Sequence, residues 1–323
     1  MKLLSYRGAN GDACVGALVD GRIVDLTAEC QALAVPEDVL RRLRRHGLAP
    51  APGGMLRLLQ SGAAGIDGLA ARLRERLRDG RAERIDAASV ELLAPVPRPG
   101  KIVAIGRNYA DHAKETGVDP FEAPRIISKM PSSVAAPNSD IARPEGVTKL
   151  DFEIELGVVI GAFAHRATRA AALDAVAGYT ILDDLSAREF QFDVPLAQTT
   201  FAKSMDGFCP MGPWLVTRDE VPDPQALELV CAVNGVEMQR GHTADMLFPV
   251  ARLIEYVTRF MTLEPGDVIA TGTPAGIGAF RKPPVWLQPG DRIRMEISGL
   301  GVLEHGISSP SPSPSKTSAL ETR

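Results

Sequence analysis

The segment Asp151–Gly161 constrains the fold most, because acidic and apolar residues alternate at its start and the remainder is continuously apolar. Side chains alternate between the two faces of an extended strand. One face would therefore carry Asp151, Glu153 and Glu155. The opposite face would carry Phe152, Ile154 and Leu156. The pattern predicts a strand beside a core, with several carboxylates gathered on one side.

Neighbouring carboxylates on a half-buried strand repel each other and lose hydration. A divalent cation would offset that cost, and Mg²⁺, Mn²⁺ or Ca²⁺ suits a shell made only of carboxylates. The alternative is a solvent-facing edge strand whose acids are simply hydrated. The segment alone does not separate these two interpretations.

A second acidic segment, Tyr179–Glu189, is an apolar strand that ends in acids and is followed by an arginine. Asp184, at the end of the strand, is a candidate third ligand. Arg188, one turn further on, suits a bidentate contact with a substrate carboxylate. The alternative for Arg188 is a salt bridge to a neighbouring acid.

His112 and Glu115 lie three residues apart in Asn108–Thr116, which predicts a short helix. That spacing puts both side chains on one helix face. A carboxylate can orient an imidazole and raise its basicity, so His112 is a candidate general base for water. The alternative is a surface His–Glu pair without a function.

The chain changes character along its length. Residues 1–30 predict short strands with a hairpin turn at Asp20–Gly21, and residues 36–88 carry apolar residues at helical spacing. The proline-rich stretch Pro95–Gly100 predicts a boundary, and strands outnumber helices from there to about residue 307. Besides Asn108–Thr116, four further helices are expected: Asp38–His46, Ile66–Arg78, Ala170–Ala177 and Pro249–Phe260.

These patterns predict a strand-rich α+β fold and not a doubly wound sheet, because no regular strand–helix–strand rhythm is present. We expect a smaller N-terminal α+β domain over residues 1–95 and a catalytic domain over residues 100–307. The low-complexity residues 308–323 are expected to be disordered.

Composition excludes several classes of function. The 323 residues have a formal net charge of -4 and no concentrated basic surface, so we expect no nucleic-acid partner. No apolar run is long enough for a signal peptide or a membrane span, and a cytoplasmic protein is expected. The cysteines have no CxxC spacing and are expected to be reduced: Cys14, Cys30, Cys209 and Cys231.

Five segments in order resemble the fumarylacetoacetate hydrolase family, in particular its bacterial acylpyruvases and 2-hydroxyhepta-2,4-diene-1,7-dioate isomerases. The segments are Gly106–His112, Asp151–Gly161, Asp184–Arg188, Lys203–Pro213 and Thr271–Gly278. Each motif is weak alone, but the five together cover about residues 100–307 with the family's order and spacing. The resemblance implies a mixed β-sandwich or roll core with a smaller N-terminal domain.

The resemblance also implies roles for single residues. The metal ligands would be Glu153, Glu155 and Asp184, holding Mg²⁺ or Mn²⁺, with Ca²⁺ as an alternative. Asp151 would lie behind them or be exposed. The catalytic residues would be His112, Glu115 and Lys203. The substrate-binding residues would be Arg188, Gln191 and Thr273. Substrate choice would depend on residues 113–145.

The implied activity is metal-dependent hydrolysis of a carbon–carbon bond in an acylpyruvate or related β-diketo acid through a metal-bound enolate. The same chemistry would also suit a 2-oxo-diacid decarboxylase, isomerase or lyase. A non-catalytic, metal-stabilised binding protein is a further alternative. The expected partner is a small 2-oxo acid or β-diketo acid substrate, and the resemblance implies a homodimer.

Overall fold

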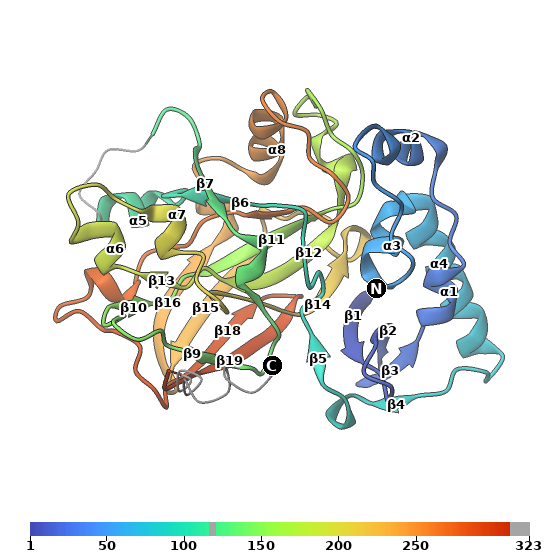
Figure 1. Ribbon diagram of the computed structural model, residues 1–323, viewed down its shortest axis with the longest axis horizontal. Helices are drawn as coiled ribbons and strands as arrows, with labels where there is room; N and C mark the ends of the chain where they lie inside the picture. Colours follow the sequence, from blue (N-terminus) through green and yellow to red (C-terminus); the bar gives the residue numbers. More distant parts are fainter. Residues whose placement is uncertain (116–120, 311–323) are drawn as a thin grey trace, which may run out of the picture.

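A large mixed sheet forms the centre of the molecule. The structure is a computed structural model that describes residues 1–115 and 121–310. Within these residues, twelve strands belong to this sheet, in the order β4-β3-β2-β1-β14-β12-β11-β17-β6-β7, with β5 beside β1 and β8 beside β14 (Figure 1). Their bounds are β1 Lys2–Arg7, β2 Ala13–Val19, β3 Arg22–Asp25, β4 Ile85–Asp86, β5 Leu92–Leu93, β6 Ile102–Gly106, β7 Arg125–Lys129, β8 Val134–Ala135, β11 Ile154–Ile160, β12 Val176–Asp183, β14 Cys209–Thr217 and β17 Val268–Ala270.

A five-stranded sheet, in the order β16-β15-β18-β19-β9, packs against one face of the large sheet. Its strands are β9 Asp140–Ala142, β15 Glu228–Val233, β16 Val236–His242, β18 Arg292–Ile297 and β19 Gly301–Ser308. Alternate residues of β11 and β18 face each other in one apolar core, among them Leu156, Val158, Ile293 and Met295. Burial of these aliphatic side chains is the main force that holds the two sheets together.

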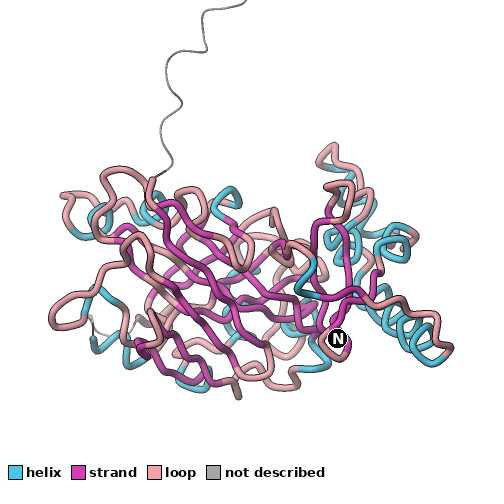
Figure 2. The backbone as a smooth tube through the Cα atoms, turned by 90° about the horizontal axis from the view of Figure 1, so that it is seen from below, coloured by secondary structure: helices cyan, strands magenta, loops and turns pink. Residues whose placement is uncertain are grey.

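A second apolar core lies on the other face of the large sheet, where the N-terminal helices pack. Helices and strands of residues 1–95 gather at one end of the molecule, blue in Figure 1, and Figure 2 shows most of the helix at that end. Strand β1 pairs with β14 through Lys2↔Val216, so these strands continue the large sheet. The division into two domains stays a prediction.

The helices are short apart from α4. Their bounds are α1 Thr27–Gln31, α2 Glu37–Arg45, α3 Gly54–Gln60, α4 Gly62–Arg78, α5 Ala110–Glu115, α6 Glu189–Phe192, α7 Thr199–Ala202 and α8 Val250–Thr258. Single 3-10 turns are η1 Ala87–Ser89, η2 Pro131–Ser133, η3 Ala172–Ala175, η4 Arg218–Glu220, η5 Thr243–Asp245 and η6 Gly278–Phe280. None of the helices in the described residues is long and apolar enough to cross a membrane.

The strand-rich α+β prediction is confirmed, and so is the hairpin at Asp20–Gly21, where both residues have positive φ. The helix expected over Ala170–Ala177 is wrong. Only the 3-10 turn η3 forms there, and Val176 already begins β12, because pairing of β12 with both β11 and β14 outweighs the helix propensity of alanine. Residues 311–323 of the predicted tail lie outside the described residues.

Candidate metal centre and the cleft around it

Three buried carboxylates meet where β11 and β12 lie side by side. Glu153 directly precedes β11, Glu155 belongs to it, and Asp184 directly follows β12. Antiparallel pairing aligns these ends, with Ile154 opposite Asp183 and the Asp184 amide donating to the Glu153 carbonyl at 2.9 Å. One carboxylate oxygen of each lies within 4.8 Å of the other two. The three ligands expected from the sequence therefore converge on one point.

Two cations from neighbouring loops contact this cluster. Lys203 Nζ donates to Glu153 at 2.9 Å and to Asp184 at 2.7 Å, and the Arg188 guanidinium donates to Glu153 at 2.5 Å. Burial alone would raise the pKa of Glu153, but Lys203 and Arg188 outweigh it and hold that pKa below its ordinary value. Glu153 is thus kept ionised.

Glu155 lacks such a partner. Its carboxylate accepts from the Gly272 amide at 2.8 Å, and no cation among the described residues donates to it. Burial, and then the charges of Asp184 and Glu153, raise the pKa of Glu155 well above its ordinary value. A carboxylate that is buried beside two others without a counter-charge marks where a further cation fits. The all-oxygen donor set suits a hard divalent ion held by Glu153, Glu155 and Asp184.

A second lysine, which the sequence analysis did not single out, also contacts the carboxylate cluster. Lys129 is fully buried, and its Nζ donates to Asp184 at 2.7 Å, to the Phe208 carbonyl at 2.8 Å and to the Lys203 carbonyl. It therefore holds one carboxylate of the cluster and the backbone of Lys203. The alternating pattern of residues in β7 does not by itself distinguish a buried Lys129 from a lysine that faces solvent on an edge strand.

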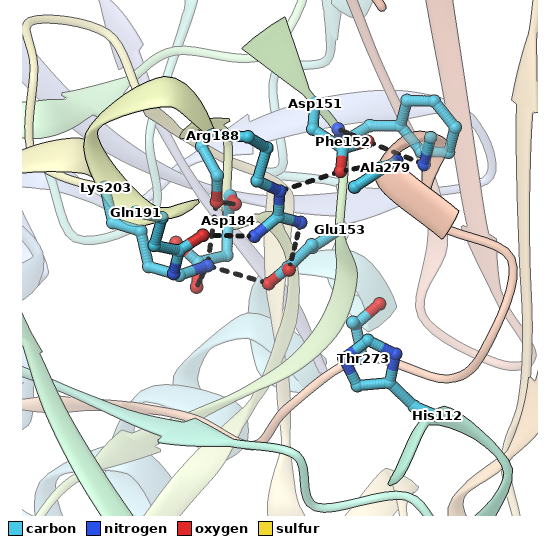
Figure 3. Close-up of polar contacts among 12 residues, drawn as sticks. His112, Asp151, Phe152, Glu153, Asp184, Arg188, Gln191, Lys203, Thr273 and Ala279 are labelled. Carbon is cyan, nitrogen blue, oxygen red and sulfur yellow. Dashed lines mark hydrogen bonds and ion pairs between the residues drawn. The ribbon is translucent and has the colours of Figure 1, made fainter. Parts of the chain in front are cut away.

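Arg188 lies between two acids, and Figure 3 shows its guanidinium between Asp151 and Glu153. Its Nε donates to Asp151 at 2.8 Å and its Nη1 to Gln191 at 2.7 Å. Asp151 is fully buried and also accepts from the Gly278 and Ala279 amides. Arg188 therefore forms salt bridges to neighbouring acids, as the alternative interpretation expected. Asp151 lies behind the cluster and is not exposed.

His112 and Glu115 form the pair expected from their spacing on α5. His112 Nδ1 lies 3.2 Å from Glu115 Oε2, and Glu115 in turn accepts from the Gly276 amide at 3.1 Å. Asn108 fixes the start of this helix by donating to the Thr271 carbonyl at 2.8 Å and to the Phe248 carbonyl at 3.1 Å. The orientation of the His112 imidazole therefore depends on its own helix and on the segment of residues 271–276, far away in the sequence.

Gln239, which the sequence analysis also missed, joins the carboxylate strand to the loop of Thr273. Its side-chain nitrogen donates to Thr273 Oγ1 at 2.7 Å and to the Pro274 carbonyl at 2.9 Å. Its oxygen accepts from the Ile154 amide at 3.1 Å. The sequence carries no signal for Gln239, because its alternate neighbours in β16 are Glu237 and Gly241 and its partners lie far away in the sequence.

One cleft is lined by almost all of the predicted site residues. They are His112, Glu153, Glu155, Asp184, Arg188, Gln191, Lys203 and Thr273. Glu115 lies behind His112 and contacts it. The cleft wall also includes Arg107, Arg125, Phe192 and Phe280. Within the segment expected to govern substrate choice, residues 116–120 lie outside the described residues, and Arg125 is part of β7.

A strand-rich fold that brings a carboxylate cluster, a His–Glu pair and buried cations into one cleft has the arrangement of an enzyme active site. Residues 101–308 match the model of the fumarylacetoacetate (FAA) hydrolase C-terminal family. The chain belongs to the fumarylacetoacetate hydrolase family, an enzyme family with hydrolase and isomerase members.

Three relatives illustrate that range. A Burkholderia multivorans protein, whose name says hydrolase without a substrate, is 44% identical over 306 residues, which is 93% of this chain and 96% of the relative. Maleylpyruvate hydrolase from Sphingobium sp. SYK-6, solved with manganese(II) and pyruvate, is 29% identical with a TM-score of 0.74, covering 96% of this chain and 100% of that one. The 2-hydroxyhepta-2,4-diene-1,7-dioate isomerase from Mycobacterium marinum is 29% identical with a TM-score of 0.68, covering 96% and 98%.

Proposed function

We propose that the protein hydrolyses the carbon–carbon bond of an acylpyruvate or related β-diketo acid, giving pyruvate and a carboxylic acid. The observation that carries this proposal is the presence, in one cleft, of three buried carboxylates and a histidine oriented by Glu115. A cation site beside a positioned base is the combination that water-dependent cleavage of a dicarbonyl requires. The manganese and pyruvate bound to the maleylpyruvate hydrolase support the same assignment.

Glu153, Glu155 and Asp184 would hold Mg²⁺ or Mn²⁺. When bound, such an ion polarises the adjacent oxygens of a 2-oxo acid and favours the enolate of the departing pyruvate. Ca²⁺ has the same oxygen preference and remains an alternative to be measured.

The chain's own residues would carry the proton transfers. Nδ1 of His112 faces Glu115, which leaves Nε2 to take a proton from water. The resulting hydroxide adds to the carbonyl furthest from the carboxylate, and the bond between that carbon and the pyruvate methylene then breaks. The electron pair stays on the methylene carbon, which takes up a proton to complete pyruvate.

Positive and polar groups would hold the substrate during these steps. Lys203 donates to two carboxylates of the cluster and would stabilise the negative charge that develops on oxygen. Gln191 and Thr273 line the cleft, and with Arg188 they would position the substrate's carboxylate and carbonyl oxygens. A bound substrate would share Arg188 with Asp151 and Glu153, which already accept from it.

Turnover of acylpyruvates tests the proposal directly. The protein is incubated with a series of acylpyruvates and with oxaloacetate, in Mg²⁺, in Mn²⁺ and in EDTA, and the products are identified. We expect pyruvate and a carboxylic acid in equal amounts, loss of turnover in EDTA, and a His112→Asn variant slower by about 10²–10⁴-fold. No turnover of any 2-oxo acid would contradict the enzyme assignment and favour a metal-stabilised binding protein.

The second candidate is decarboxylation, isomerisation or a lyase reaction of a 2-oxo diacid. It is supported by the likeness to the dioate isomerase and needs no attacking water. Carbon dioxide as a product, or an isomer without a new acid, would favour it over hydrolysis. In that case His112 would transfer a proton of the substrate and would not activate water. The loss of turnover in His112→Asn would then report on that proton transfer.

A cytoplasmic homodimer belongs to the same proposal. Exposed apolar side chains occur on β7 and directly after it, on α7 and on the segment between α6 and α7: Ile126, Met130, Leu196 and Phe201. A second copy of the chain would remove them from water. Light scattering should give twice the chain mass, and Leu196→Asp together with Phe201→Asp should reduce it to one chain. A wild-type protein of single-chain mass would contradict the dimer.

A further inference from the structure

A buried imidazole on the five-stranded sheet contacts the strand end that leads into Asp184. His305 belongs to β19, and its side chain is fully buried. Its Nε2 lies 2.8 Å from Oδ2 of Asp183, which is also fully buried and ends β12. The two residues are 122 positions apart in the sequence. This contact therefore joins the five-stranded sheet to the carboxylate cluster from behind.

Asp183 uses its other oxygen to hold the backbone of a candidate ligand. Its Oδ1 accepts from the Glu153 amide at 2.8 Å, and the Asp184 amide donates to the Glu153 carbonyl at 2.9 Å. Residues 183 and 184 thus hold Glu153 at both its amide and its carbonyl. Because Asp184 directly follows Asp183, the placement of the Asp183 carboxylate affects two of the three candidate ligands.

The Asp183 carboxylate lies between the two sheets and does not line the cleft. Burial, and then the charge of Asp183, raise the pKa of Cys231, which belongs to β15 in the apolar core between the sheets. A carboxylate in such surroundings requires donors from the protein. Among the described residues, His305 is the side chain that supplies one.

His305 makes no other hydrogen bond among the described residues. Its Nδ1 is buried and has no partner in this part of the chain. An imidazole with one nitrogen unpaired in an apolar core costs free energy that an aliphatic side chain would not cost. Packing alone therefore does not account for a histidine at this place in β19, whereas the contact with Asp183 does.

We propose that His305 is a positioning residue for the metal centre: by fixing the Asp183 carboxylate it holds the Glu153 backbone, and with it the spacing of Glu153 and Asp184. This inference rests on the proposed function only for a divalent ion at the carboxylate cluster. His305 does not line the cleft and would touch neither ion nor substrate. Its effect should be larger for Mg²⁺, which demands near-ideal octahedral geometry, than for Ca²⁺, whose coordination is flexible.

Calorimetric titration of the full-length, metal-stripped protein with Mg²⁺ and with Ca²⁺ tests this role without turnover. His305→Leu removes the donor and keeps a buried side chain. We expect its Mg²⁺ affinity to fall about 10–100-fold and its Ca²⁺ affinity to fall about threefold or less. His305→Gln can place an amide donor near the position of Nε2, so its Mg²⁺ affinity should return to within about threefold of the wild type.

A matched control on the same strand separates positioning from loss of stability. Leu303, two residues before His305 in β19, is fully buried in the apolar core and has no polar atom to hold Asp183. Leu303→Ala should lower the unfolding midpoint by leaving a cavity, and its Mg²⁺ affinity should stay within about twofold of the wild type. If His305→Leu does not fold, His305→Asn, whose amide ends short of the Nε2 position, replaces it with the same expected result.

Each outcome of these titrations decides for or against the role of His305. Unchanged Mg²⁺ affinity in His305→Leu, an equal loss in Leu303→Ala, or parallel losses for both ions would overturn it. A wild type that binds neither ion would overturn the metal centre as well. Mg²⁺ affinity that depends on His305 in a protein that hydrolyses no acylpyruvate would contradict the proposed function and leave this inference standing. Hydrolysis with a metal affinity independent of His305 would do the reverse.

Discussion

The cleft and the N-terminal part of the molecule use the same charged residue types in opposite ways. In residues 1–95, Arg81 donates to Asp79 at 2.6 Å and Arg7 to Glu91 at 2.7 Å, and all four side chains are at least one-third exposed. In the cleft, Lys129 and Lys203 each donate to Asp184 at 2.7 Å, and their side chains are at most 4% exposed. The distances are alike, and only the burial differs.

That difference decides what each set of charges does. Water screens the surface pairs, so each partner stays hydrated when the other is removed. A buried charge has no such alternative, and removing its partner leaves a desolvated ion. The cleft charges therefore depend on one another, whereas the surface charges act singly.

The largest effect is expected from Asp184→Asn, which removes one ligand and the partner of two lysines. Loss of its charge should reduce Mg²⁺ affinity strongly and slow turnover by about 10³-fold, because several kcal/mol of charge stabilisation depends on the bound ion. Metal titration followed by calorimetry, together with steady-state kinetics, checks this. Asp174→Asn, at an exposed aspartate, should change neither quantity. Unchanged metal affinity in Asp184→Asn would refute the ligand assignment.

A smaller but still large effect is expected from Lys129→Met. The change keeps the side-chain volume and removes the ammonium that orients Asp184 and the Lys203 backbone, so metal affinity or turnover should fall about 10–100-fold. Stability should fall by about 3–5 kcal/mol, measured by urea unfolding. Lys149→Met breaks an exposed pair with Asp193 and serves as the control. Equal behaviour of the two variants would remove the contrast between buried and exposed charge.

A pH dependence is expected in the metal-stripped protein. Burial, and then Asp184 and Glu153, raise the pKa of Glu155, so the folded state keeps a proton that the unfolded state releases above about pH 4.5. Unfolding is then favoured as pH rises, and the unfolding midpoint should decline as the pH is raised above about 4.5. Glu155→Gln should flatten this slope, and saturating Mg²⁺ should abolish it in the wild type. A midpoint that rises with pH in the stripped wild type would count against the proton on Glu155.

The smallest effect is expected from Arg81→Gln on the surface. The pKa of Asp79 is lowered mainly by the hydrogen bond from Arg81, but both groups are in contact with water. The unfolding midpoint should not change measurably, and neither should its response to 0.5 M salt, about the level at which surface pairs are screened. A clear loss of stability would show that this pair is coupled to the packing beneath it.

The sequence predicted the carboxylates of the site because acids inside apolar strands are unusual enough to be noticed. Glu153, Glu155 and Asp184 each interrupt or end a run of apolar residues, and strand alternation put the first two on one side. Lys129 and Gln239 were missed because their partners lie 34 to 85 residues away in the sequence, a separation that no local pattern encodes.

Secondary structure was predicted incompletely for the same reason, namely that contacts distant in the sequence decide some conformations. Strand and turn patterns predicted the strand-rich fold, and the turn at Asp20–Gly21 has the positive φ that these residues tolerate. Ala170–Ala177 failed because neighbouring strands decided its conformation. The ion pairs of Arg188 could be named as an alternative from the sequence, but the choice required knowing that Asp151 is buried beside it.

The pairing of β1 with β14 has a consequence for how the protein is made. During synthesis the first residues emerge early and can form the hairpin of β1 and β2, and β5 can pair with Ser5 and Tyr6 on the other edge of β1. Lys2 and Leu3 on that edge have no partner until residues 209–217 have left the ribosome. A nascent chain of intermediate length would therefore carry an open strand edge, a surface prone to pairing with other chains. Because β6 similarly waits for β17, the cleft closes only near the end of translation. Chains truncated before residue 270 should accumulate as aggregates.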